Sequence, residues 1–286
     1  MCDFRMKINR EKSRLGTWRV AVVCWMVFGL TSSLYAGERY ALVIGNSGYT
    51  HSARLGNPAN DARAVAAKME ELGFSVSRGF DLTKPAMDEL FQAFSSLLEE
   101  DDVAVFFYAG HGMQIDKKNF LVPIDFNPQT GGPLINQLMV LDELLNAMAS
   151  RAGVNLVFLD ACRNNPLANQ LVASMTKGRS AIIDQNRDVK VVGQGLAQIK
   201  GKVGTLIAYA TQPGNVAMDG AGSHSPFTTG LLEHIAEPGV EVRKMLTRVR
   251  VSVVVETDGQ QIPWDHSSLV DSFYFKKKKR RPPPPP

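Results

Sequence analysis

Two residues of this chain have the side chains and the setting of a nucleophile and its general base. His111 lies in the segment Tyr108-Ala109-Gly110-His111-Gly112, and Cys162 lies in Asp160-Ala161-Cys162; each segment follows a strongly apolar stretch. An imidazole beside a thiol promotes ionisation of the thiol, and the thiolate is the attacking species. The glycines on both sides of His111 would let a substrate backbone approach closely and would free local amides to serve as an oxyanion site. The pattern predicts nucleophilic catalysis by Cys162 with His111 as the base.

Each of these residues also has a structural interpretation. A lone Cys in an apolar stretch is usually a small buried hydrophobe, and a lone His is more often structural than catalytic. The pairing favours catalysis, because ligands of an open parallel sheet bind beyond the carboxyl ends of its strands. The remaining histidines lack a comparable setting and, with one Cys, offer no ligand cluster, so no metal site is predicted. They are His51, His224, His234 and His266.

The N-terminal residues 1–36 have the three parts of a secretory signal. A basic stretch precedes an apolar run from Val20 to Leu30, and small and polar residues follow up to Ala36, after which we expect cleavage. The run is shorter than the roughly 20 apolar residues of a membrane-spanning helix, so an uncleaved anchor is the alternative. The signal predicts export to the periplasm or the cell exterior.

The expected export signal changes how many cysteines the mature chain would contain. The chain has three cysteines, and Cys2 and Cys24 would leave with the signal. Cys162 would then be the single thiol of the mature chain, in a compartment where disulfides are favoured. A thiol without an internal partner is either reactive or buried and inert.

The segments around His111 and Cys162 alternate between two periodicities. Apolar strands are expected at 40–44, 74–76, 103–108, 154–159 and 205–210, and a hairpin at 113–123. Amphipathic helices are expected at 59–72, 84–99, 140–151, 226–236 and 240–250. Strands that are apolar on both faces and alternate with helices indicate an α/β fold, with a mainly parallel sheet covered on both sides.

Two polar segments flank this pattern. Residues 167–203 are rich in Gly, Lys and Arg without clear periodicity, which indicates a long surface loop. The tail at 276–286 combines the basic run Lys276–Arg281 with five prolines, and we expect it to be disordered or extended. Contact with an anionic surface and a merely solubilising role are the two interpretations of this tail.

The charge distribution excludes one class of partner. The net charge of +4 arises at the two termini, because the intervening stretch 37–275 is net acidic. The isoelectric point of about 8.9 therefore gives no reason to expect nucleic-acid binding by the domain itself.

The sequence resembles the caspase-like cysteine peptidases, and most of all their bacterial metacaspase-like branch. Cys162 follows His111 by about 50 residues, the separation found in caspases. The resemblance covers nearly all of 39–275. It rests on the stretches 40–46, 57–72, 108–112, 160–166, 204–211, Ser225-Pro226-Phe227-Thr228 and Gln261-Ile262-Pro263-Trp264.

This resemblance implies a caspase-like three-layer sandwich, in which helices flank a mostly parallel sheet of about six strands. It implies His111 as base and Cys162 as nucleophile. The backbone amides of Gly112 and Cys162 would form the oxyanion site. The family requires no third acidic residue in the catalytic group.

Asp160 departs from the caspase pattern, which has Gln at this position. Metacaspase-like enzymes also place an acid there and cut after Arg or Lys. An acidic pocket would pair with a basic side chain and reject an acidic one. Asp219 is a second candidate for the pocket. The structural alternative for Asp160 is a turn residue that hydrogen-bonds its own backbone.

The sequence thus predicts a cysteine-type endopeptidase, a hydrolase acting on peptide or protein substrates after Arg or Lys. A non-catalytic caspase-like module that binds peptides is one alternative, and a Cys-dependent esterase or transpeptidase is another. No cofactor is predicted. Metacaspase relatives sometimes need calcium, but no dedicated calcium loop is visible in the sequence. The oligomeric state stays open.

Overall fold

The computed structural model describes residues 37–115, 118–130, 134–161, 196, 199, 202–213, 215 and 217–278. The expected signal at 1–36 and the expected nucleophile, Cys162, lie outside the described residues. Most of the loop expected at 167–203 and residues 279–286 of the tail also lie outside them.

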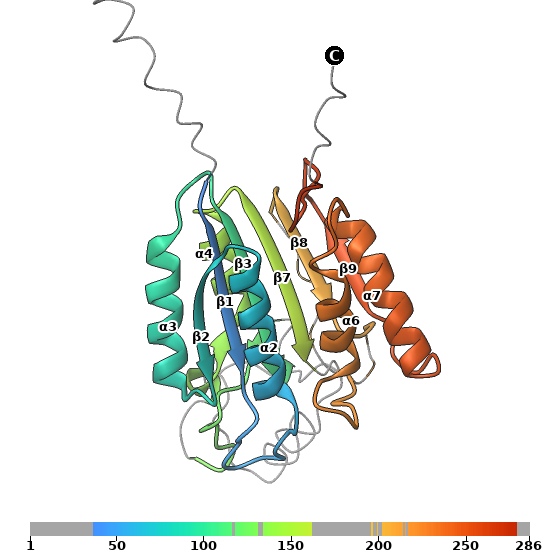
Figure 1. Ribbon diagram of the computed structural model, residues 1–286. Coiled ribbons are helices and arrows are strands. Elements are labelled where there is room, and N and C mark those ends of the chain that lie inside the picture. The colour runs from blue at the N-terminus through green and yellow to red at the C-terminus, as the bar shows by residue number, and fades with distance from the viewer. Residues whose placement is uncertain are drawn as a thin grey trace, which may run out of the picture. The chain divides into compact units, whose positions relative to one another are not determined.

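Six strands of the described part form one sheet in the order β2-β1-β3-β7-β8-β9 (Figure 1). The strands are β1 (Arg39–Gly45), β2 (Ser75–Phe80), β3 (Val103–Gly110), β7 (Val154–Ala161), β8 (Thr205–Tyr209) and β9 (Trp264–Ser267). All pairings are parallel except that of β9 with β8. The expected mostly parallel sheet is confirmed. Strand β9 escaped the sequence analysis because Trp-Asp-His-Ser contains no apolar run.

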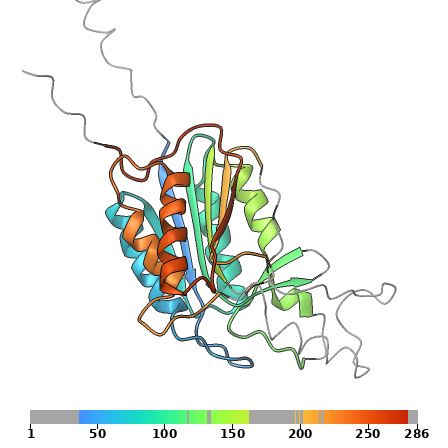
Figure 2. The ribbon, with the colours of Figure 1, turned by 90° about the vertical axis from the view of Figure 1, so that its right-hand side faces the viewer.

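Helices cover both faces of this sheet (Figures 1 and 2). On one face, α2 (Pro58–Glu71), α6 (Pro226–His234) and α7 (Val242–Glu256) bury apolar residues against the strands. On the other face, α3 (Lys84–Leu97) and α4 (Leu141–Ala149) do the same. Strand β1 contributes Val43 to the first core and Ile44 to the second, as the alternation of side chains along a strand requires. The three-layer sandwich is therefore confirmed.

None of the helices in the described ranges is long and apolar enough to cross a membrane.

A second, smaller sheet contains the expected hairpin, which consists of β4 (Gly112–Ile115) and β5 (Lys118–Leu121). Strand β6 (Met139–Val140) pairs with β5, and a short 3₁₀ helix spans Leu134–Gln137. Because β4 begins one residue after His111, this small sheet continues the chain directly from the candidate base.

Sheet topology brings the candidate catalytic segments to one edge. From β1 the chain crosses to β2 on one side and then to β3 on the other, so the strand order reverses at β1. In parallel α/β sheets, ligands bind at such a reversal, outside the carboxyl ends of the strands. Strand β3 also pairs with β7, and Gly110 lies opposite Ala161. The ends of β1, β3 and β7 therefore meet at one edge.

Parts of the two polar segments, 167–203 and 276–286, contact the domain. Within the span 167–203, Leu196 and Ile199 are buried at 2% and 6% exposure. At the start of the tail, the carbonyl of Lys276 accepts a hydrogen bond from the Gly239 amide at 2.8 Å. The ordered domain therefore includes the first residues of the tail, and the span 167–203 is not a surface loop throughout.

Candidate active site

The His111 imidazole is held by the loop that follows β1. Its Nε2 lies 2.8 Å from the carbonyl oxygen of Ala53, and the Tyr49 ring packs against it with centroids 4.4 Å apart. A carbonyl oxygen only accepts hydrogen bonds, so Nε2 carries the proton and Nδ1 has the lone pair. Among the described residues, the buried Nδ1 has no hydrogen-bond partner. Burial lowers the pKa of His111, which favours the neutral form that a base requires.

Two tyrosine hydroxyls hold the His111 backbone. The His111 amide donates to Tyr49 Oη at 2.7 Å, and Tyr108 Oη donates to the His111 carbonyl at 2.8 Å. Gly110 precedes His111 with φ of 148°. A Cβ on Gly110 would lie 2.7 Å from the Tyr49 hydroxyl and 2.8 Å from that of Tyr108. This close approach requires glycine at position 110. The two tyrosine hydrogen bonds fix the backbone from which the His111 imidazole projects.

The end of β7 lies against the residues on both sides of His111. Ala161 pairs with Gly110, and a Cβ on Gly112 would lie 3.4 Å from the Cβ of Ala161. Cys162 follows Ala161 by one peptide bond and lies outside the described residues, as does its amide. The two motifs that the sequence analysis paired therefore do converge in the fold. Gly112, the other expected oxyanion residue, is at the start of β4 beside this junction.

A pocket opens next to Gly110 at the end of β3, with about 300 Å³ of empty space that includes open solvent. Three carboxylates from three separate parts of the chain line it: Asp61 of α2, Asp160 of β7 and Asp219. Its remaining lining residues are Leu55, Pro58, Ala109, Gly110, Ala217, Met218 and Ser225. The sequence analysis named Asp160 and Asp219 as pocket acids, and the structure brings them together.

Asp160 is buried and is held by the N-terminal turn of α6. Its Oδ2 accepts hydrogen bonds from the hydroxyls of Ser225 and Thr228, the latter at 2.9 Å. Ser225 is also the N-cap of α6, because its Oγ accepts from the Thr228 amide. Burial raises the pKa of Asp160 to about 6, although both hydroxyls oppose this rise and Asp219 adds to it. These contacts differ from those of a turn residue bonded to its own backbone.

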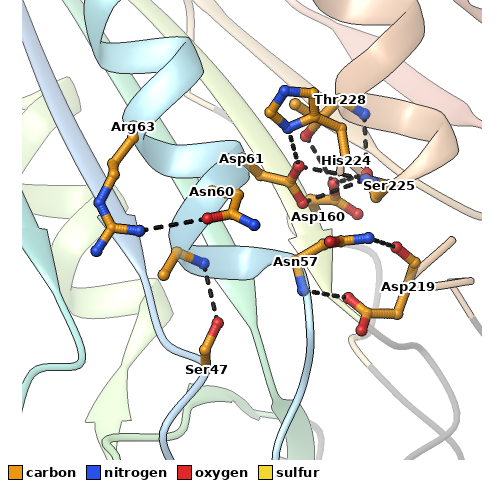
Figure 3. A network of polar contacts seen from close by, with 11 residues as sticks. Ser47, Asn57, Asn60, Asp61, Arg63, Asp160, Asp219, His224, Ser225 and Thr228 are labelled. Carbon is orange, nitrogen blue, oxygen red and sulfur yellow. Dashed lines mark hydrogen bonds and ion pairs between the residues drawn. The ribbon is translucent and has the colours of Figure 1, made fainter. Parts of the chain in front are cut away.

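Asp219 joins the segment after β8 to the loop that carries Ala53. Its Oδ2 accepts from the Gly56 amide at 2.6 Å, and its Oδ1 accepts from the Asn57 amide at 3.2 Å. The Asn57 side-chain amide donates in return to the Asp219 carbonyl at 2.6 Å (Figure 3). Asp219 therefore connects the acidic pocket with the loop that contacts the His111 imidazole.

Asp61 is the pocket acid that the sequence analysis did not assign to the site. Its Oδ1 lies 2.9 Å from Nδ1 of His224 and accepts from the Ser225 amide at 3.2 Å (Figure 3). Burial and the nearby Asp160 raise the pKa of Asp61 to about 8. Its signal in the sequence is its helical position, because Asp61 shares the buried face of α2 with Val65 and Met69. A carboxylate on such a face is rare unless it is paired or functional.

Metal binding has no support in the described part of the chain. There, no group of three or more His, Cys, Asp or Glu side chains is arranged to hold a metal ion. Carboxylates in a partly enclosed site can pair with a guanidinium or ammonium group.

Comparisons with known proteins agree with this architecture. The family model described as "Caspase domain" matches residues 38–274. The chain is similar to the mucosa-associated lymphoid tissue lymphoma translocation protein 1 of Homo sapiens, with 31% identity over 134 residues. These residues are 46% of this chain and 16% of that protein, so the match spans a small part of the relative's length. The Mus musculus homologue gives the same identity and coverage.

A solved structure shares the fold. Caspase-1 from Spodoptera frugiperda superposes with a TM-score of 0.57 and 17% identity, covering 86% of this chain and 92% of that one. At this identity the likeness concerns the fold alone.

Proposed function

Because the chain belongs to the caspase-domain family of cysteine peptidases, we propose that it is an endopeptidase that cleaves after Arg or Lys. The observation that carries this specificity is the pocket beside Gly110, where Asp61, Asp160 and Asp219 lie together and none of the described lining residues is Lys or Arg. The resemblance to the metacaspase-like branch, with an acid at position 160, agrees with the same specificity.

In the proposed reaction, Nδ1 of His111 takes the proton of the Cys162 thiol, and the thiolate attacks the carbonyl carbon of the scissile bond. The negative charge that develops on the carbonyl oxygen would be stabilised by the amides of Gly112 and Cys162. The imidazolium then gives its proton to the leaving amine. The Ala53 carbonyl, 2.8 Å from Nε2, supports this cycle because it orients the ring and accepts its second N–H. Water, activated by the same imidazole, hydrolyses the thioester that remains on Cys162.

The residue before the cleaved bond would enter the acidic pocket. A guanidinium or ammonium there would meet carboxylates that are held in place by other contacts, so little reorganisation is needed on binding. An aspartate or glutamate side chain would instead be placed among three acids, and like-charge contacts of this kind cost several kcal/mol. The pocket therefore supports a preference for basic residues over acidic ones.

Reporter peptides that end in Arg, Lys or Asp test this proposal. We expect cleavage of the Arg and Lys reporters, and loss of cleavage in Cys162→Ala and His111→Ala with the fold retained. Asp160→Asn should cost about 2–4 kcal/mol in transition-state stabilisation, as for a buried charge pair that loses one partner. Asp88 on α3, which is partly exposed and pairs with Lys84, provides a matched control as Asp88→Asn. Equal cleavage of the Asp and Arg reporters would refute the specificity.

The same panel separates the alternative functions. A Cys-dependent esterase would hydrolyse ester reporters while sparing peptides, and a transpeptidase would transfer the acyl group to an added amine. A non-catalytic module would bind the Arg peptide without cleaving it. Iodoacetamide should label Cys162 and stop cleavage, because a nucleophilic thiolate reacts readily.

We also propose that the chain is exported and cleaved after Ala36. The support is the order of basic, apolar and small residues within 1–36. N-terminal sequencing of the protein recovered from the periplasm or the medium tests this proposal. A mature chain that begins at Gly37 is expected, and an intact N-terminus in the membrane fraction would favour the uncleaved anchor.

A further inference from the structure

The acidic pocket concentrates negative charge, and none of the lining residues in the described part of the chain is Lys or Arg. Asp61, Asp160 and Asp219 all line it, and Asp61 and Asp160 are 1% and 7% exposed. Placing several ionised carboxylates in one poorly solvated space is unfavourable, and the usual relief is that one of them keeps a proton. We therefore expect one of the three carboxyl groups to stay protonated when no cation is bound. Binding of a cation in the pocket would favour loss of that proton.

The charged and titratable groups around Asp61 show where that proton is held. Asp160 faces it from β7 and Asp219 from the segment after β8, and both raise its pKa. His224, just before α6, contacts Asp61 Oδ1 through its Nδ1 at 2.9 Å. On α2 itself, the nearby Arg63 directs its guanidinium over the Phe80 ring at 4.7 Å.

Strand β3 adds no charged residue to the pocket wall, and His111 follows this strand beyond Gly110. The His224 side chain is 28% exposed, whereas that of Asp61 is 1% exposed. The imidazole therefore connects a buried carboxyl group with solvent through a direct contact. The pKa of about 8 for Asp61 agrees with a carboxyl that keeps its proton in the empty pocket.

We propose that entry of an Arg or Lys side chain into this pocket releases one proton from the Asp61–His224 pair, so that recognition of the basic residue is coupled to pH. This inference rests on the proposed function and specifies how the pocket takes its cation. In the step, the O–H bond of the Asp61 carboxyl breaks and its electron pair stays on the carboxylate. The carboxylate then pairs with the cation, and the proton leaves through the His224 imidazole to water.

Calorimetry can count this proton. The full chain with Cys162→Ala is titrated at pH 7.5 with a peptide that carries Arg before the scissile bond. The titration is repeated in phosphate and in Tris, whose ionisation enthalpies differ. The same peptide with citrulline is the control, because citrulline keeps the shape of Arg and lacks its charge. We expect roughly half to one proton released on binding of the Arg peptide and none on binding of the citrulline peptide.

Variants assign the proton to the pair. In Asp61→Asn the amide cannot ionise, so proton release should fall to near zero, whereas Asp88→Asn on α3 should leave it unchanged. In the background without pocket substitutions, the Kd of the Arg peptide should rise by up to tenfold per unit as the pH falls from about 7.5 to 6.5. This pH series tests the inference even if Asp61→Asn does not fold.

The outcomes separate the inference from the proposed function. An Arg peptide that binds at least tenfold more tightly than citrulline, with the same enthalpy in both buffers and a pH-independent Kd, would overturn proton release while basic specificity stands. Equal binding of the two peptides would overturn both. Proton release that persists in Asp61→Asn would show that another group carries the proton and would refute the role of the pair.

Discussion

Replacement of Asp61 by Asn should change how the stability of the domain depends on pH. In the folded protein, burial and Asp160 raise the pKa of Asp61 from its ordinary value of 3.8 to about 8. Between these two values the folded state keeps a proton that the unfolded chain has released. Because the unfolded state then binds fewer protons, the free energy of unfolding falls as the pH rises through this range. Asn cannot titrate, so Asp61→Asn loses this contribution.

The magnitude follows from proton linkage. One full proton of difference between the folded and unfolded states corresponds to about 1.4 kcal/mol per pH unit. From about pH 5.5 to 7.5, Asp61 should therefore lower the stability of the wild-type protein by up to about 3 kcal/mol. The amide still accepts from the Ser225 backbone N–H, so the variant should keep the local hydrogen bond and gain stability relative to wild type mainly at the higher pH.

The assay is urea unfolding of wild type and Asp61→Asn at about pH 5.5, 6.5 and 7.5, with linear extrapolation to water. Contributions from titrating groups outside the pocket are common to both proteins, so the difference in slope reports Asp61 together with the pocket acids that interact with it. Asp88→Asn should follow the wild-type slope. If wild type and Asp61→Asn have the same pH slope, Asp61 is ionised in the empty pocket and the reasoning above is refuted.

Three further predictions concern other parts of the chain. Tyr49→Phe removes the hydroxyl that accepts a hydrogen bond from the buried backbone amide of His111. We expect kcat to fall about tenfold with KM unchanged. A change in KM alone would contradict a positioning role for Tyr49. Deleting residues 279–286, which spares the attached start of the tail, should weaken binding to anionic vesicles at low salt without changing peptidase activity; unchanged vesicle binding would favour the solubilising interpretation. We expect the protein to cleave itself after Arg179 or Arg187, within the basic segment 167–203. Mass spectrometry of new N-termini, after incubation of the purified protein with and without calcium, should show cuts that are absent in Cys162→Ala. An active enzyme that stays intact would exclude self-processing as its activation step.

Local patterns in the sequence were sufficient for most of the fold. The apolar strand at 154–159 appears as β7 and the amphipathic helix at 59–72 appears as α2, because both periodicities depend on neighbouring residues alone. Parallel pairing followed from strands that are apolar on both faces. Helix ends were less well predicted, and α7 runs to Glu256 where the pattern suggested an end near 250. Val251 and Val255 near that end are exposed, so they continue the helix without belonging to its buried stripe.

The residues of the candidate site could likewise be predicted from the sequence only in part. Residue type and position at a strand end were enough to select His111, whereas Asp160 was selected through the resemblance to the metacaspase-like branch. The contact between His111 and the Ala53 carbonyl could not be predicted, because a backbone carbonyl is present at every position and carries no side-chain signal. The pairing of Asp61 with His224 joins residues that are 163 positions apart.

The sequence by itself determined most of the helices and strands, and it determined that a Cys, a His and an acid stand at or just after the ends of expected strands. Only the tertiary structure decided that a third acid from α2 shares the pocket and that His224 connects this acid with solvent. The physical reason is that periodicity and residue type act locally, whereas the burial and mutual repulsion of Asp61, Asp160 and Asp219 exist only once α2, β7 and the segment after β8 have packed together.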